Sequence, residues 1–380
     1  MTPREMLARL VAFPTVSRDS NLPLIDFVEE HLRGHGVSAC RVPSDEGAKE
    51  NLYATIGPMV PGGVVLSGHT DVVPVDGQPW DTDPFELTAR DGRLHGRGAC
   101  DMKAFCAIAL SLVPEMKRLK RPIHLALSYD EEVGCLGAPR MIRELQARVP
   151  PPAAVIVGEP TEMRVMTAHK GIAVFRTVVT GHEAHSSQTH RGVSAVMTAA
   201  RLITWLDDQA RARRAGTPPG SGFEPPFTTV HVGMVQGGTA INIISRRCEF
   251  SWDVRSIPGD DPAALAAELQ RHAEANLLPE MRRIAAEAGV ETEALVSAPP
   301  LRDEPESAAA ALAKTLTGQT TTGKVPFSTE AGQFQEAGLP AVVCGPGSID
   351  QAHQPNEYIT VAQLEAGEAF LQRLIAHLST

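Results

Sequence analysis

Three short apolar runs in this chain each end in acidic or imidazole side chains that can bind a metal ion. The runs are residues 64–68 before His69, residues 123–129 before Asp130, Glu131 and Glu132, and residues 153–158 before Glu159. Runs this apolar predict strands buried on both faces, as in a parallel sheet. Ligands of such sheets bind outside the carboxyl ends of the strands. We therefore expect side chains far apart in sequence to converge at one edge.

Five side chains are the candidates for this convergence. They are His69, Asp101, Glu132, Glu159 and His353. Two imidazoles and three carboxylates together suit two divalent metal ions. The donor set therefore predicts a metal-dependent hydrolase. A purely structural zinc site would instead favour a closed shell of Cys and His.

Two of the five candidates also have an ordinary structural explanation. Asp101 follows the glycines of residues 96–98 and stands where a helical apolar pattern begins. An Asp at this place commonly caps a helix, so capping competes with metal binding. His353 lies in a loop, where a single His is usually a surface residue. It becomes a ligand only as the second imidazole of the set.

The acidic residues after the second run also suggest separate roles for neighbouring carboxylates. Adjacent carboxylates repel one another unless cations neutralise them. Because neighbouring side chains point in different directions, we predict Glu132 as a ligand and Glu131 as the general base. A metal-bound imidazole usually donates its other N–H to a second group, often a carboxylate. Asp71, two residues after His69, is the candidate for orienting that ring.

Composition sets the broad class. A chain of 380 residues exceeds one typical core, so two domains are expected. The net charge of -10 disfavours a nucleic-acid partner, and no apolar run approaches the length of a membrane span. We expect a cytoplasmic protein with no membrane or nucleic-acid partner. Its six scattered cysteines predict reduced thiols rather than a disulfide framework.

The pattern of elements predicts an inserted domain. Helices and buried strands alternate up to about residue 171, and strands with one polar face follow. These later strands and two helical stretches, 193–212 and 262–287, run in the order βαββαβ. We predict an α/β catalytic domain with a mainly parallel sheet (1–171 and 299–380). An α+β domain of ferredoxin-like order (172–298) would interrupt it, with a Gly/Pro-rich loop at 216–226.

Short motifs spread over nearly the whole chain resemble those of one metallohydrolase family. They include residues 67–71 (Ser-Gly-His-Thr-Asp), 96–103, 158–161 (Gly-Glu-Pro-Thr), 181–187 and 352–355 (Ala-His-Gln-Pro). On these motifs the chain resembles the di-zinc metallopeptidase and deacylase family that includes aminoacylase and bacterial glutamate carboxypeptidase. Residues 80–85, 328–335 and 345–355 are most similar to the acetylornithine deacetylase branch.

The resemblance implies how the ligands divide between two metal ions. His69 and Glu159 would bind one ion, Glu132 and His353 the other, and Asp101 would bridge them. A cis peptide bond after the bridging residue, between Asp101 and Met102, is also implied. Zinc is the expected metal, and cobalt or manganese are alternatives that a carboxylate-rich pair can accept.

The resemblance further implies roles for residues that bind substrate. His185 of the inserted domain would act across a homodimer as an oxyanion donor. Asn242 would contact substrate, and Arg255 would pair with its α-carboxylate, although a cross-strand salt bridge with a nearby acid is the alternative. Glu330 either recognises a cationic side chain or is a surface residue that caps a turn. The inserted domain would serve as lid and dimerisation domain.

The implied reaction is removal of the acetyl group from N2-acetyl-L-ornithine, which gives L-ornithine and acetate for arginine biosynthesis. Other deacylations on the same scaffold, of acetylcitrulline or succinyl-diaminopimelate, are alternatives, as is a dipeptidase. A non-catalytic binding protein of the same fold is a remote alternative. The complete ligand set and the presence of Glu131 speak against it.

Overall fold

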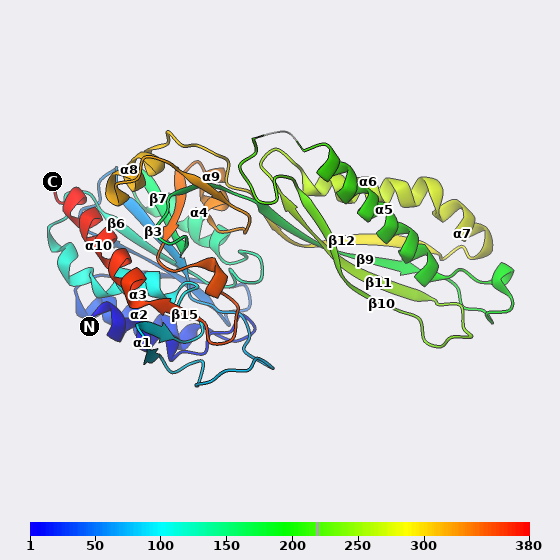
Figure 1. Ribbon diagram of the computed structural model, residues 1–380, viewed down its shortest axis with the longest axis horizontal. Helices are drawn as coiled ribbons and strands as arrows, with labels where there is room; N and C mark the ends of the chain where they lie inside the picture. Colours follow the sequence, from blue (N-terminus) through cyan, green and yellow to red (C-terminus); the bar gives the residue numbers. More distant parts are fainter. Residues whose placement is uncertain (218–219) are drawn as a thin grey trace. The chain divides into compact units, whose positions relative to one another are not determined.

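The chain folds into two units, each with its own hydrophobic core. The computed structural model describes residues 1–217 and 220–380 (Figure 1). The first unit comprises Met1–His169, Leu301–Lys324 and Thr329–Thr380, and the second comprises Lys170–Pro300 and Val325–Ser328. The first unit is therefore assembled from three separate stretches of chain.

An eight-stranded sheet forms the centre of the first unit, in the order β1-β2-β6-β3-β7-β14-β8-β13. Its strands are β1 (Ala39–Pro43), β2 (Glu50–Ile56), β3 (Val64–His69), β6 (Ile123–Ser128), β7 (Ala154–Pro160), β8 (Met166–His169), β13 (Gly323–Val325) and β14 (Ala341–Gly345). The neighbours β6, β3, β7 and β14 pair in parallel, whereas β1, β2 and β8 pair antiparallel. The predicted α/β class is confirmed, with a mixed sheet whose parallel part is central.

Helices cover both faces of this sheet (Figure 1). Helices α1 (Pro3–Val11), α2 (Leu22–Gly34), α3 (Lys103–Ser111), α8 (Ala308–Thr317) and α10 (Val361–Leu378) share the main core with one face. Helices α4 (Ala138–Arg148) and α9 (Ala331–Glu336) contact each other and strands of the sheet. All residues of β3, β6, β7 and β14 are buried as a result, as their apolar runs predict.

Local sequence signals explain where several helices begin. Thr2 and Glu5 form a reciprocal capping box at the start of α1, where Pro3 needs no hydrogen-bond partner for its nitrogen. The Thr360 side chain caps α10 by accepting from the Gln363 amide. Asp101 does not cap α3, because Met102 occupies the N-cap position and no side-chain cap bond forms there. The Asp101 carboxylate thus has another role.

A small three-stranded sheet, in the order β15-β5-β4, joins distant parts of the first unit. It consists of β4 (Thr88–Arg90), β5 (Arg93–His95) and β15 (Tyr358–Thr360). The antiparallel pairing of β15 with β5 places the segment after His353 against the segment before Asp101. The described part of the first unit also contains the 3-10 helices η1 (Val113–Arg118) and η3 (Ile349–Gln351), and η2 (Thr189–Arg191) belongs to the second unit.

The second unit is a four-stranded antiparallel sheet, in the order β10-β11-β9-β12, with helices packed on it. Its elements are β9 (Gly171–Thr180), α5 (Ala195–Ala215), β10 (Thr229–Gly237), β11 (Arg247–Ser256), α6 (Pro262–Asn276), α7 (Leu278–Ile284) and β12 (Gly289–Ala298). The predicted βαββαβ order is confirmed. Every second residue of β11 is buried, including Phe250 and Trp252.

Some predicted element boundaries are wrong. The single helix expected at 262–287 is two helices, α6 and α7, because Pro279 cannot donate a backbone hydrogen bond there. The helical apolar pattern that begins near Asp101 forms α3 up to Ser111, and the chain then continues as the 3-10 helix η1. Of the predicted loop 216–226, residues 218–219 lie outside the described residues, and the rest contains no helix or strand. Among the described residues, no helix has the length and apolar character to cross a bilayer.

Candidate metal centre

The five candidate ligands all lie in the first unit. His69 ends β3, Glu159 lies near the end of β7, and Glu132 follows β6. These three strands are parallel neighbours, so their carboxyl ends meet at one edge of the sheet. Asp101 and His353 reach the same place from loops before α3 and after η3.

The Asp101 carboxylate lies between the two imidazoles. Its Oδ1 is 3.1 Å from His69 Nε2, and its Oδ2 is 3.5 Å from His353 Nε2. His69 Nε2 is also 3.7 Å from Glu159 Oε1, and His353 Nε2 is 2.9 Å from Glu132 Oε2. Each imidazole therefore has its own carboxylate and shares a third one, which is the arrangement that a pair of ions needs.

The described residues include two groups of three side chains whose ligand atoms lie within 4.8 Å of one another inside each group. One group is His69, Glu131 and Glu159, and the other is His69, Asp101 and Glu132. The first group includes Glu131, which the sequence predicts to be the base. Its Oε1 accepts a hydrogen bond from Cys135 Sγ at 3.2 Å. Glu131 is also partly exposed, whereas Glu159 is 4% exposed. Glu132 is partly exposed as well, so exposure does not distinguish the predicted base from the predicted ligand.

Burial of like charges dominates the electrostatics of this cluster. Burial raises the pKa of Glu131 to about 8, although the charge of His69 opposes the shift. Burial and the Asp101 charge raise the pKa of Glu132 to about 7 and that of Glu159 well above its usual range. The hydrogen bond to Glu132 raises the pKa of His353 to about 9.

These shifts test whether the residues suit a metal pair. Carboxylates of like charge share a buried space, so their ionised forms need nearby positive charge. Divalent cations supply that charge, and oxygen and imidazole donors suit zinc, cobalt or manganese. The donor set, its burial and its spacing therefore fit a two-metal site.

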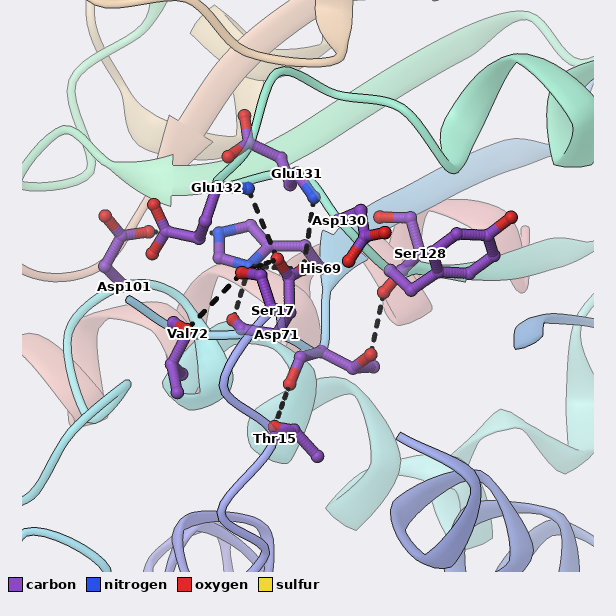
Figure 2. Close-up of polar contacts among 12 residues, drawn as sticks. Thr15, Ser17, His69, Asp71, Val72, Asp101, Ser128, Asp130, Glu131 and Glu132 are labelled. Atoms are coloured by element: carbon purple, nitrogen blue, oxygen red, sulfur yellow. Dashed lines mark hydrogen bonds and ion pairs between the residues drawn. The ribbon is translucent and has the colours of Figure 1, made fainter. Parts of the chain in front are cut away.

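Asp71 occupies an unexpected place in this site (Figure 2). His69 Nδ1 is 2.9 Å from the backbone oxygen of Asp71 and 3.6 Å from its carboxylate Oδ1. The carboxylate instead accepts hydrogen bonds from the Glu131 amide at 3.2 Å, the Glu132 amide at 3.3 Å and Ser17 Oγ at 2.7 Å. The backbone of Asp71 thus orients His69, and its side chain holds the loop that carries the base and a ligand.

The N-terminal segment supports this arrangement from below the site (Figure 2). Thr15 Oγ1 donates to the backbone oxygen of Thr70, whose own hydroxyl donates to the backbone oxygen of Ser128. The Ser17 hydroxyl reaches Asp71 directly. Ser17 has no motif or spacing that links it to Asp71, 54 positions away, so the sequence gives no signal for its role.

The remaining sequence candidate in the first unit is Glu330. It is 1% exposed and lies at the start of α9, where it forms no side-chain cap bond. Its Oε2 accepts from Ser67 Oγ at 3.1 Å, and its buried Oε1 has no hydrogen-bond partner among the residues that the structure describes. Burial raises its pKa. The alternative of a surface residue capping a turn is therefore excluded.

Three candidates lie in the second unit. His185 Nδ1 is 2.8 Å from Ser187 Oγ, and the side chain of Asn242 is exposed. Arg255 Nε is 3.5 Å from Asp253 Oδ1 on the same strand, so this acid is not the cross-strand partner considered as the alternative. The Arg255 side chain is 40% exposed. The structure does not bring these residues together with the metal-ligand cluster inside one unit.

The mixed α/β fold and its carboxylate–imidazole cluster are those of a metal-dependent hydrolase. The chain belongs to peptidase family M20/M25/M40, whose family model matches residues 65–377. It is 38% identical to an acetylornithine deacetylase of Myxococcus xanthus, over 98% of this chain and 97% of the relative. An acetylornithine deacetylase of Pasteurella multocida is 32% identical over 99% and 98%.

Solved structures of the family share the fold. The M20 metallo-carboxypeptidase Sso-CP2 of Sulfolobus solfataricus has a TM-score of 0.78 at 18% identity, covering 99% of each chain. A Bacillus subtilis protein described as a dinuclear metal-binding peptidase has a TM-score of 0.67 at 17% identity, covering 99% of this chain and 97% of its own. The predicted family, fold class and hydrolase class are confirmed. The predicted cis peptide between Asp101 and Met102 is also present.

Proposed function

We propose that this protein hydrolyses N2-acetyl-L-ornithine to L-ornithine and acetate, a reaction of arginine biosynthesis. Full-length relatives named acetylornithine deacetylase support the substrate. The observation that carries the chemistry is the position of Asp101, with one carboxylate oxygen near each imidazole. A carboxylate placed in this way is suited to join two ions.

His69 and Glu159 are proposed to hold one ion, Glu132 and His353 the other, and Asp101 both. Zinc is proposed as the metal, with cobalt or manganese as alternatives. Such a pair of ions, when bound, polarises the amide carbonyl and lowers the pKa of the attacking water.

Glu131 is proposed to move the proton. It takes a proton from the attacking water and delivers it to the departing α-amine, so that one carboxyl serves as base and then as acid. Its position supports this role, because Asp71 fixes the Glu131 amide and Cys135 contacts its carboxylate. Arg255 and Asn242 are proposed to bind the substrate, His185 to donate to the developing oxyanion, and Glu330 to recognise the substrate's cationic side chain.

The second unit is proposed to act as lid and to join two copies of the chain. Strand β10 lies at the edge of its sheet and leaves one row of backbone groups without a neighbouring strand. Met234 and Val235 on β10 are 71% and 63% exposed, and Ile241 in the following loop is fully exposed. An edge strand beside exposed apolar side chains suits pairing with a second copy, which would form a homodimer.

A substrate panel tests the proposal. N2-acetyl-L-ornithine should be turned over faster than acetylcitrulline, succinyl-diaminopimelate or a dipeptide. A chelator should abolish turnover, and added zinc or cobalt should restore it. Preference for another member of the panel would replace the proposed substrate, and full activity in the chelated protein would remove the metal mechanism.

A variant tests the proposed base separately. Glu131→Ala should bind two ions but lose turnover by at least about 100-fold, the scale of general acid–base catalysis. Glu144→Ala is the matched control, because that glutamate lies on the exposed face of α4 and pairs with Arg148. Near-normal turnover by a doubly loaded Glu131→Ala variant would exclude Glu131 as the base.

A further inference from the structure

A buried carboxylate outside the proposed ligand set connects the two loops that carry Asp101 and His353. Glu357 is 1% exposed. Its Oε1 accepts from the backbone amides of Cys100 at 2.8 Å and Asp101 at 3.0 Å. Its Oε2 accepts from the Gly98 amide at 3.0 Å and from Arg97 Nη1 at 2.8 Å. Four donors fill the acceptor capacity of one carboxylate.

Arg97 extends this connection to the other side of His353. Its side chain is also 1% exposed, and Nη1 donates to the backbone oxygen of Gln354 at 3.3 Å. Its Nη2 donates to the side-chain oxygen of Gln78, whose amide nitrogen donates to the His353 backbone oxygen at 3.0 Å. The guanidinium also lies over the Trp80 ring, 5.1 Å from its centroid.

The position of His353 depends on these contacts more than do the positions of the two ligands that lie on strands. His69 and Glu159 lie on strands β3 and β7, whose backbones are fixed by neighbouring strands. His353 has a left-handed backbone conformation, with φ of 63°, and its side chain is 51% exposed. Its backbone is held through Gln78 and Arg97, which in turn pairs with Glu357.

We propose that Arg97 and Glu357 are positioning residues that set the relative placement of Asp101 and His353. This placement sets the affinity for the second metal ion, which is the ion held by Glu132, His353 and Asp101. The proposal rests on the two-metal function above and deepens it. The pair binds no ion itself. It fixes the backbones of two ligands that are 252 positions apart (353 − 101). Groups that orient metal ligands commonly change metal affinity by about 10- to 100-fold when altered.

The decisive variant is Glu357→Gln, which keeps the size of the side chain and removes its charge. Metal-free protein would be titrated with Co²⁺, and binding followed by visible absorption and by competition with a chelator. Wild-type protein should bind two ions. Glu357→Gln should lose about 10- to 100-fold in second-ion affinity and less in first-ion affinity, because the first ion shares only Asp101 with the two ligands that the pair positions.

Asp303→Asn is the matched control, because Asp303 pairs with Lys324 in the same unit and accepts from Thr167. Both of its Co²⁺ affinities should equal those of wild type, and thermal unfolding would show whether either variant is destabilised. A control that loses second-ion affinity as much as Glu357→Gln would overturn the proposal.

A second variant separates positioning from simple stability. Glu357→Gln alone leaves the buried Arg97 charge without its partner, which destabilises the fold. The double variant Arg97→Met/Glu357→Gln removes both charges and should recover folding stability, while second-ion affinity stays low. Recovery of second-ion affinity together with stability would overturn the proposal, as would unchanged affinity in Glu357→Gln. If wild-type protein bound no ion, the proposed function itself would fail, and this inference with it.

Discussion

The unexpected contacts of Asp71 lead to a prediction about how its side chain contributes to turnover. In Asp71→Asn, the backbone oxygen that faces His69 Nδ1 is retained. The altered side chain loses its charge and presents an NH₂ group to at least one of its three present donors, which are the Glu131 amide, the Glu132 amide and Ser17 Oγ. The perturbation therefore acts on the loop of the base rather than on His69.

The structure sets the size of the effect. Asp71 is 2% exposed, so water cannot replace a lost contact. One hydrogen bond to a charged group contributes about 1.5–3 kcal/mol. If that energy holds Glu131 and Glu132 in their working positions, its loss lowers turnover by about 10- to 100-fold.

Turnover of N2-acetyl-L-ornithine and stepwise Co²⁺ binding should be measured on the same preparation of Asp71→Asn. We expect lower turnover and a weaker second ion, with first-ion affinity unchanged because His69 stays oriented. Ser17→Ala should show the same pattern more weakly, since it removes one neutral donor to this carboxylate. A first-ion affinity that fell as far as turnover would refute the reasoning and show that the carboxylate orients His69.

Two further predictions concern stability. Burial lowers the pKa of His124 to about 4, below its unfolded value of about 6.5, so its stability contribution is present above 6.5 and is lost as pH falls towards 4. Urea midpoints at about pH 7 and 4.5 should therefore differ less in His124→Gln than in wild type. Gly158→Ala would place Cβ 2.0 Å from Phe105 and should cost about 1–3 kcal/mol or more in thermal unfolding. An added Cβ at Gly34 would meet no atom within 4 Å, so Gly34→Ala should leave the free energy of unfolding unchanged.

Much of the fold follows from local sequence patterns. The uninterrupted apolar runs of β3, β6 and β7 require burial on both faces, which only a covered sheet provides. Alternating residues in β11 equally require one buried face. The convergence of His69, Glu132 and Glu159 then follows, because the ends of parallel strands share an edge.

The remaining parts of the centre depend on contacts that no local pattern encodes. Asp101 and His353 come from loops, whose paths are set by the β5–β15 pairing and the Arg97–Glu357 pair. The His-x-Asp spacing suggested a carboxylate partner for His69, but the Asp71 backbone fills that place. The Asp71 carboxylate instead accepts hydrogen bonds from the backbone amides of Glu131 and Glu132, which are 60 and 61 residues away. No local sequence pattern links residues at that separation.

The position of β14 has a consequence for synthesis of the protein on the ribosome. This strand, residues 341–345, lies between β7 and β8, which are both made far earlier. A nascent chain that ends before it leaves the edge of β7 open, and it also lacks His353. The large sheet is completed only after residues 341–345 have emerged, so a shorter nascent chain is exposed to misassembly until then. The candidate ligand set and the central part of the sheet thus both depend on residues 341–353, and neither is complete in a nascent chain that lacks them.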